Sequence, residues 1–113
     1  MPCAGQLQTL LIVMDPIVHF CNTLKRVTPS QRIHILTHIS KKQVSLARQI
    51  AYNVLINKDI ALSEKDKKYF RRHLTSIKEL ASKKINLDRK RLILVKKHLL
   101  FKRLCIIILT YLK

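Results

Sequence analysis

The sequence predicts an all-α protein, a small single-domain bundle of four to five helices. Three observations lead to this prediction. Apolar residues recur at helical spacing in several segments, and no useful length alternates with a period of two. Capping residues stand before each of these segments. The 113 residues include one Gly and three Pro, which leaves few residues for hairpin turns or glycine-rich phosphate loops.

Five capping signals mark the expected helix starts. Asp15 precedes a proline, which suits the first helical position because an N–H there has no helical partner. Thr28 and Ser40 each have a glutamine three residues later, the pattern of a capping box. Ser63 precedes acidic residues that the helix dipole favours, and Asn86 opens the last segment. The expected helices are 16–26, 29–39, 41–57, 64–82 and 87–112.

The chain is expected to have three parts. Residues 1–14 form a poorly ordered N-terminal segment, residues 15–103 a helical basic domain, and residues 104–113 an apolar C-terminal tail. The apolar run of this tail has about half the length of a membrane-spanning helix, so packing into a core or an oligomer interface is expected instead. Three cysteines without paired spacing and the lack of a secretory signal indicate an intracellular protein without disulfides.

Positive charge is concentrated in the second half of the chain. The formal net charge is +17, from 23 basic and 6 acidic residues. Residues 63–103 alone carry 15 basic and 4 acidic residues. Such an excess predicts a polyanionic partner, DNA or RNA, bound mainly through phosphate contacts. The residues expected to make these contacts are Lys67, Lys68, Arg71, Arg72, Lys83, Lys84, Arg89, Lys90, Arg91, Lys96, Lys97 and Arg103.

Two further patterns bear on this surface. Arg89, Lys96 and Arg103 recur every seven residues, so one continuous helix would place them on one face. Tyr69 lies among cations, where it could stack on a base or sit at the edge of the core.

No residue pattern predicts catalysis, and we expect neither an enzymatic activity nor a cofactor. Few acidic residues and a single glycine leave little for an active site. His34 and His38 have the spacing of two metal ligands on a helix, but no third ligand is evident. No metal site is therefore expected.

Part of the chain resembles a known family. The residues concerned are Asn53-Val54-Leu55, Ile60-Ala61-Leu62-Ser63, Lys67-Lys68, Arg72-His73, Ile77, Leu80-Ala81-Ser82-Lys83-Lys84-Ile85, Leu87, Lys90-Arg91 and Leu94-Val95. They are similar to a run "N-x-L … I-P-L-S … K-K … R-H-K … L-A-x-K-x-x-x-L-x-x-K-R-x-L" in short basic proteins of Polinton/Maverick (adintovirus-like) DNA elements in animal genomes. The match covers roughly residues 30–97. It implies a gene of a virus-like element, with a role near that element's DNA or capsid.

The chain departs from this family pattern in two places. The family's turn before "L-S" usually carries Gly and Pro, where this chain has Asn57-Lys58-Asp59 and Ala61. The family continues into "K-G-G-F-L" after the basic helix, whereas Lys97 is followed here by His98-Leu99-Leu100-Phe101. Residues 98–113 are therefore expected to be a diverged or relict end.

The sequence predicts a small cationic nucleic-acid-binding accessory protein of a virus-like mobile element, which binds or packages its genome. A nuclear or virion-associated location would fit that role. One alternative is a structural protein that self-associates or binds a capsid protein through its apolar helix faces and the segment 104–112. A second is a basic helix that acts at a membrane surface, the least expected of the three.

Overall fold

The structure is a computed structural model that describes residues 16–57 and 60–112. All regular structure in these two ranges is α-helical, which confirms the expected all-α class. The expected N-terminal segment 1–14 and the cap Asp15 lie outside the described residues. The helices are a first helix over residues 16–26, α2 (Pro29–Thr37), α3 (Lys41–Ile56), α4 (Glu64–Arg72), α5 (Leu74–Ala81), α6 (Leu87–Lys96) and α7 (His98–Leu112).

Side-chain caps start four of these helices where the sequence predicts them. Thr28 and Ser40 each form a complete capping box with the glutamine three residues later. The Ser63 hydroxyl accepts a hydrogen bond from the backbone N–H three residues on, at 3.1 Å. Asn86 Oδ1 does the same for Arg89, at 2.8 Å. These side chains satisfy N–H groups that have no partner within the helix.

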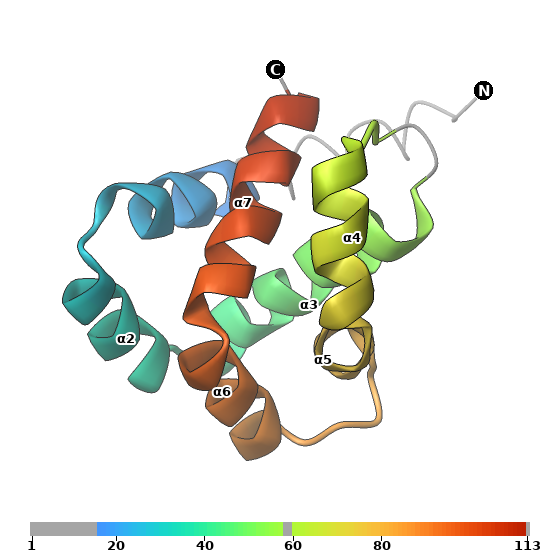
Figure 1. Ribbon diagram of the computed structural model, residues 1–113. Helices are drawn as coiled ribbons and strands as arrows, with labels where there is room; N and C mark the ends of the chain where they lie inside the picture. The colour runs from blue at the N-terminus through green and yellow to red at the C-terminus, as the bar shows by residue number, and fades with distance from the viewer. Residues whose placement is uncertain (1–15, 58–59, 113) are drawn as a thin grey trace, which may run out of the picture.

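Two of the expected helices are each divided, so the expected number of four to five helices is too low for the described residues. The segment 64–82 breaks at His73, and the segment 87–112 breaks at Lys97. Both residues have φ near −113°, with ψ of 18° and 38°. No Gly or Pro marks these positions, so packing is the cause. α5 packs along α3, whereas α4 leaves that contact and points in another direction (Figure 1).

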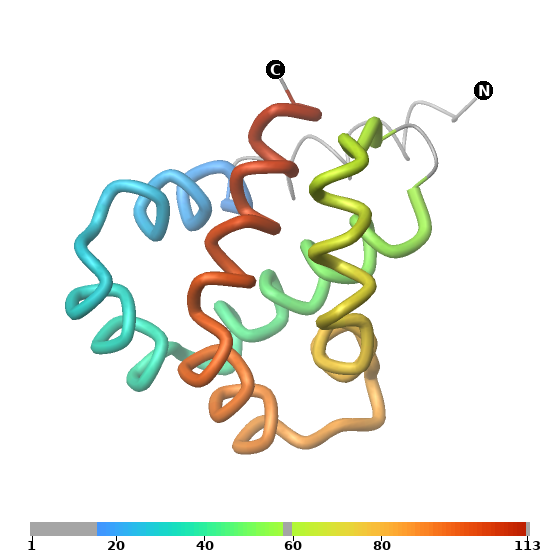
Figure 2. Tube along the Cα trace, in the orientation of Figure 1, coloured from blue at the N-terminus to red at the C-terminus, as the bar shows by residue number. Residues whose placement is uncertain are grey.

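The helices are arranged around α3, which contacts α5, α6 and α7. α2 contacts α6 and α7, and α5 contacts α6. In the tube view of Figure 2, α7 passes between the first helix and α2 on one side and α4 on the other. The break at Lys97 lets α6 pack against α2 and α5 while α7 packs against α3.

One core takes side chains from all of these helices. Its largest fully buried apolar residues include Leu24, Leu36, Ile50, Ile77, Leu80, Leu94, Phe101 and Leu104. The ring of Phe101 lies 5.9 Å from that of Phe20 in the first helix, measured between centroids. The expected C-terminal tail is the second half of α7, and Leu104, Cys105 and Ile108 are buried. Residues 98–112 therefore form an integral part of the fold.

Two buried thiols meet inside this core. Cys21 of the first helix and Cys105 of α7 are free cysteines with no exposed surface. Burial and a hydrogen bond to the Cys21 side chain raise the pKa of the Cys105 thiol well above its ordinary value. The charge of Arg32 opposes this rise only in part. The pair holds the first helix against α7 as two small apolar groups.

Arg32 of α2 is buried, although it is charged and only 1% of its surface is exposed. Its Nε donates to the carbonyl of Leu24 at 3.1 Å, and Nη2 donates to the carbonyl of Val27 at 3.1 Å. Both carbonyls lie at the end of the first helix, where carbonyls lack helical partners and the helix dipole favours a cation. Nη1 lies 3.4 Å from Nδ1 of His98, the first residue of α7. One side chain thus joins three helices.

Replacing this arginine should destabilise the protein far more than removing an exposed one. Arg32→Ala leaves buried carbonyls without donors, so we expect the free energy of unfolding to fall by about 3 kcal/mol. The exposed Arg26→Ala variant should lose less than about 0.5 kcal/mol. Urea unfolding followed by circular dichroism measures both. Similar losses in the two variants would show that the buried hydrogen bonds of Arg32 contribute little.

Candidate nucleic-acid interface

Few cations of the basic segment are neutralised within the protein. Each carboxylate between residues 63 and 103, a stretch that the structure describes throughout, pairs with one cation. The ion pairs are Lys67–Glu64 (3.4 Å), Arg103–Asp66 (2.7 Å), Arg89–Glu79 (3.2 Å) and Arg91–Asp88 (3.7 Å). Fifteen cations stand in this stretch, so eleven have no carboxylate partner among the described residues. Ten of them are at least partly exposed, so their charge is available to an external anion, whereas Lys90 is buried.

The structure separates the twelve residues expected to bind nucleic acid into three groups. The exposed ones are Lys67, Lys68, Arg71, Arg72, Lys83, Lys84, Arg89 and Lys96. Arg91, Lys97 and Arg103 are half-buried. Lys90 is buried, with 6% of its surface exposed.

Five of these cations belong to the two helix segments that end at the breaks. Lys68, Arg71 and Arg72 lie in the last two turns of α4, while Lys96 and Lys97 stand at the end of α6. The Lys97 side chain reaches across to His73, with Nζ 3.3 Å from Nδ1 of the imidazole. We call these five residues the break patch. It is assembled from segments about 25 residues apart in the sequence.

His73 is the neutral centre of the break patch. Burial lowers the pKa of His73 below its ordinary value of 6.5, and the charges of Lys97 and Arg72 lower it further. Because the Lys97 ammonium can only donate, Nδ1 of the imidazole accepts and Nε2 carries the proton.

Tyr69 and Arg103 are engaged with one another next to this patch. The Arg103 guanidinium carbon lies 4.7 Å from the centre of the Tyr69 ring and Nη1 lies 2.7 Å from Asp66 Oδ1. The His73 ring packs against the same tyrosine, at 4.7 Å between centroids. Tyr69 is half-buried among these groups, an arrangement that supports its interpretation as a residue at the core edge.

Arg91 and Lys90 are engaged within the fold and are not part of the exposed cationic surface. Nε and Nη2 of Arg91 both donate to the carbonyl of Ile39, at 3.1 and 2.8 Å, just beyond the end of α2. Burial lowers the pKa of Lys90, and the charge of Arg48 lowers it further. The expected continuous face through Arg89, Lys96 and Arg103 is wrong, because the break at Lys97 places Arg103 on a different helix.

Neither a metal centre nor a membrane span emerges from the described residues. His34 and His38 are exposed, with ring centroids 4.8 Å apart, and no group of three or more His, Cys, Asp or Glu side chains is assembled in the described ranges. Across residues 16–57 and 60–112, no helix combines the length and apolar character required to cross a bilayer.

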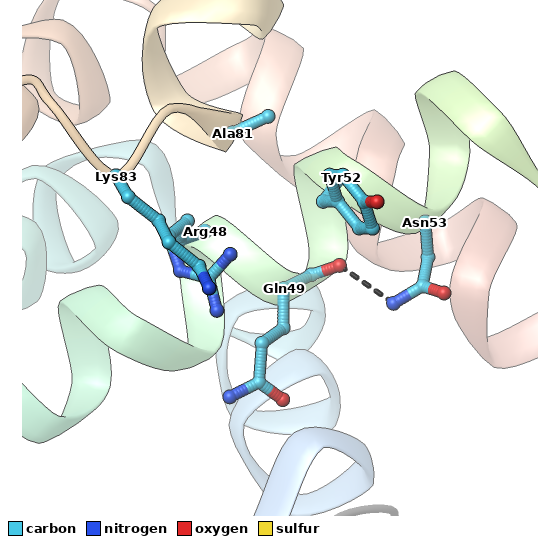
Figure 3. Close-up of a pocket in the computed structure, with 6 residues that line it drawn as sticks. All are labelled: Arg48, Gln49, Tyr52, Asn53, Ala81 and Lys83. Atoms are coloured by element: carbon cyan, nitrogen blue, oxygen red, sulfur yellow. Dashed lines mark hydrogen bonds between the residues drawn. The ribbon is translucent and has the colours of Figure 1, made fainter.

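The structure also forms a cationic pocket that the sequence does not indicate. It lies between α3 and the end of α5, has a volume of about 410 Å³ and is shown in Figure 3. The lining residues are Arg48, Gln49, Tyr52, Asn53, Ala81 and Lys83. Only Lys83 was among the expected binding residues. Arg48 and Tyr52 lie outside the densest basic run, and only the packing of α3 on α5 reveals their proximity to Lys83.

Comparisons of the chain with protein-family models, curated proteins and solved structures give no match.

The neutral state of His73 should make stability depend on pH. Since the pKa of His73 is lower in the folded protein than its unfolded value of 6.5, the unfolded chain binds more protons between these two values. The free energy of unfolding should therefore fall as the pH drops from about 7.5 to about 5.5. Urea unfolding at several pH values measures this slope.

His73→Gln should reduce the slope, because an amide can accept from Lys97 without titrating. His38→Gln, at an exposed histidine, is the control and should retain it. An unchanged slope in the His73 variant would place the titrating group elsewhere.

Proposed function

We propose that this protein is a small nucleic-acid-binding protein that contacts DNA or RNA phosphates through its cationic surface, without reading base sequence. The observation that supports this proposal is that all four carboxylates between residues 63 and 103 are already paired. Eleven cations of that described stretch therefore have no acidic partner. Such a surface gains affinity by releasing the counterions condensed on nucleic acid.

The break patch is the part of this surface best suited to a phosphate backbone. Arg71 and Arg72 are exposed, belong to no ion pair among the described residues, and carry planar guanidinium groups that can hold a phosphate through two hydrogen bonds. Lys96 and Lys97 extend the charge from a second helix. Contacts of this kind go to the phosphate backbone, which carries no base sequence information.

The biological setting in this proposal is a virus-like mobile element, because of the resemblance over residues 30–97. The protein would bind or package the genome of that element, in the nucleus or in a virion, without catalysing a reaction. The break patch includes Arg72, and the resemblance includes Arg72-His73 and Lys67-Lys68, so part of the matching run lies in the proposed interface.

The salt dependence of binding tests this function. The affinity for a labelled DNA duplex, measured by fluorescence anisotropy, should fall steeply as salt increases. Arg71→Ala with Arg72→Ala should lower both the affinity and the salt slope, by up to about 2 in the slope because each neutralised phosphate contributes roughly 0.9.

Lys25→Ala with Arg26→Ala removes the same charge from the first helix and should change the slope less. Equal effects of the two double variants would exclude the break patch as the main interface. An affinity that does not change with salt would overturn the proposed function itself.

A second candidate function is self-association through the outer face of α7. Leu99 is 59% exposed, and Ile106 and Ile107 line, with Leu99, a groove of about 550 Å³ next to α4. Exposed apolar side chains around a groove are typical of an interface. If this is the function, light scattering should detect dimers without nucleic acid, and Leu99→Asp should dissociate them. A monomer at all concentrations would exclude it.

A further inference from the structure

The cationic pocket between α3 and α5 has two chemically distinct sides (Figure 3). Arg48 and Lys83 occupy one side, and Tyr52 and Asn53 occupy the other. None of the six described lining residues is acidic. Glu79, a carboxylate of α5, pairs with Arg89 at 3.2 Å, while Arg48 and Lys83 belong to no ion pair among the described residues.

The cationic side of the pocket is formed by Arg48 and Lys83. Arg48 lies close enough to the buried Lys90 of α6 for its charge to lower the pKa of that amine, after the larger effect of burial. Lys83 adds a further cation from the end of α5. Two positive groups therefore line one side of the pocket, a third lies behind Arg48, and an anion bound between Arg48 and Lys83 would reduce their repulsion.

The opposite side of the pocket presents the aromatic ring of Tyr52, which has no aromatic or cationic partner among the described residues. Tyr52 is 46% exposed and makes no ring or cation contact with the described residues, in contrast to Tyr69. Asn53 donates through Nδ2 to the carbonyl of Gln49 at 2.7 Å, which leaves Oδ1 able to accept a hydrogen bond. A flat ring and an amide oxygen suit a nucleobase, because every base has a π-face and most carry an amino group or N–H.

We propose that this pocket holds one nucleotide of single-stranded nucleic acid, with its phosphate between Arg48 and Lys83 and its base on the ring of Tyr52. The inference rests on the proposed function and adds a strand preference to it. A duplex keeps both faces of each base stacked on its neighbours, so the Tyr52 ring can reach a base only in a single strand. The break patch, by contrast, needs only phosphates and takes either form.

The strand preference can be tested through Tyr52. The probes are a fluorescein-labelled dA12 strand, a labelled duplex of the same length, and free AMP, all at one salt concentration. Tyr52→Ala should weaken binding of dA12 about fivefold to 100-fold and leave the duplex unchanged, whereas Tyr52→Phe should bind like the unmodified protein. Because the chain has three Tyr and no Trp, quenching of tyrosine fluorescence by dA12 should also be largely lost in Tyr52→Ala.

Matched variants separate stacking and charge from general effects. Tyr111→Ala removes another exposed tyrosine, far along the chain on α7, and should bind dA12 normally. Arg48→Gln with Lys83→Gln should weaken dA12 more than Lys25→Gln with Arg26→Gln, which removes the same charge elsewhere. Thermal melting of each variant excludes unfolding as the cause of a loss.

The outcomes distinguish this inference from the function on which it rests. If dA12 and duplex binding both depend on salt and on Arg71 and Arg72, but Tyr52→Ala changes neither, the pocket proposal is wrong and the proposed function stands. Equal losses for dA12 and duplex in Tyr52→Ala would also overturn it. AMP binding as tight as dA12 binding would assign the pocket to a free nucleotide instead of a strand. Salt-independent binding of every probe would remove the proposed function as well.

Discussion

The buried guanidinium of Arg32 is the interaction on which the packing of the first helix, α2 and α7 depends. Arg32 belongs to no ion pair among the described residues, and backbone carbonyls compensate its charge instead. Arg91 repeats the solution at the end of α2, where it donates twice to Ile39. Many helices end at a glycine, and the one Gly of this chain precedes the first helix in the sequence. Two arginines distant in sequence close helix ends in its place.

This use of arginine divides the cations between the fold and the surface. Arg32, Arg91 and Arg103 are held by carbonyls, a carboxylate or an aromatic ring, and each links two or more helices. Apart from the buried Lys90, most of the described lysines and remaining arginines are exposed. Both breaks serve packing, yet they also bring the ends of α4 and α6 within reach of one another through Lys97 and His73. The same backbone irregularities that complete the core thereby join two helix ends that carry cations.

Local chemistry in the sequence was sufficient for the helix starts but not for the helix breaks. The capping side chains at Thr28, Ser40, Ser63 and Asn86 act within three residues. The helix starts can therefore be predicted from the local sequence. His73 and Lys97 carry no such mark, because contacts with α3 and α2 decide where those helices turn. The candidate site follows the same rule. The exposed cations of α4 were identifiable, but the burial of Lys90, the structural role of Arg91 and the pocket around Tyr52 depend on helices that meet only in three dimensions.

The contact between Cys21 and Cys105 has a consequence for how opening of the molecule can be observed. A thiol reacts with alkylating reagents as its thiolate, and burial with a raised pKa keeps Cys105 in the unreactive thiol form while the helices remain packed. Its modification requires the first helix and α7 to separate, either locally or through global unfolding. The rate at which Cys105 is alkylated therefore reports how often those two helices separate, and the measurement needs no engineered label.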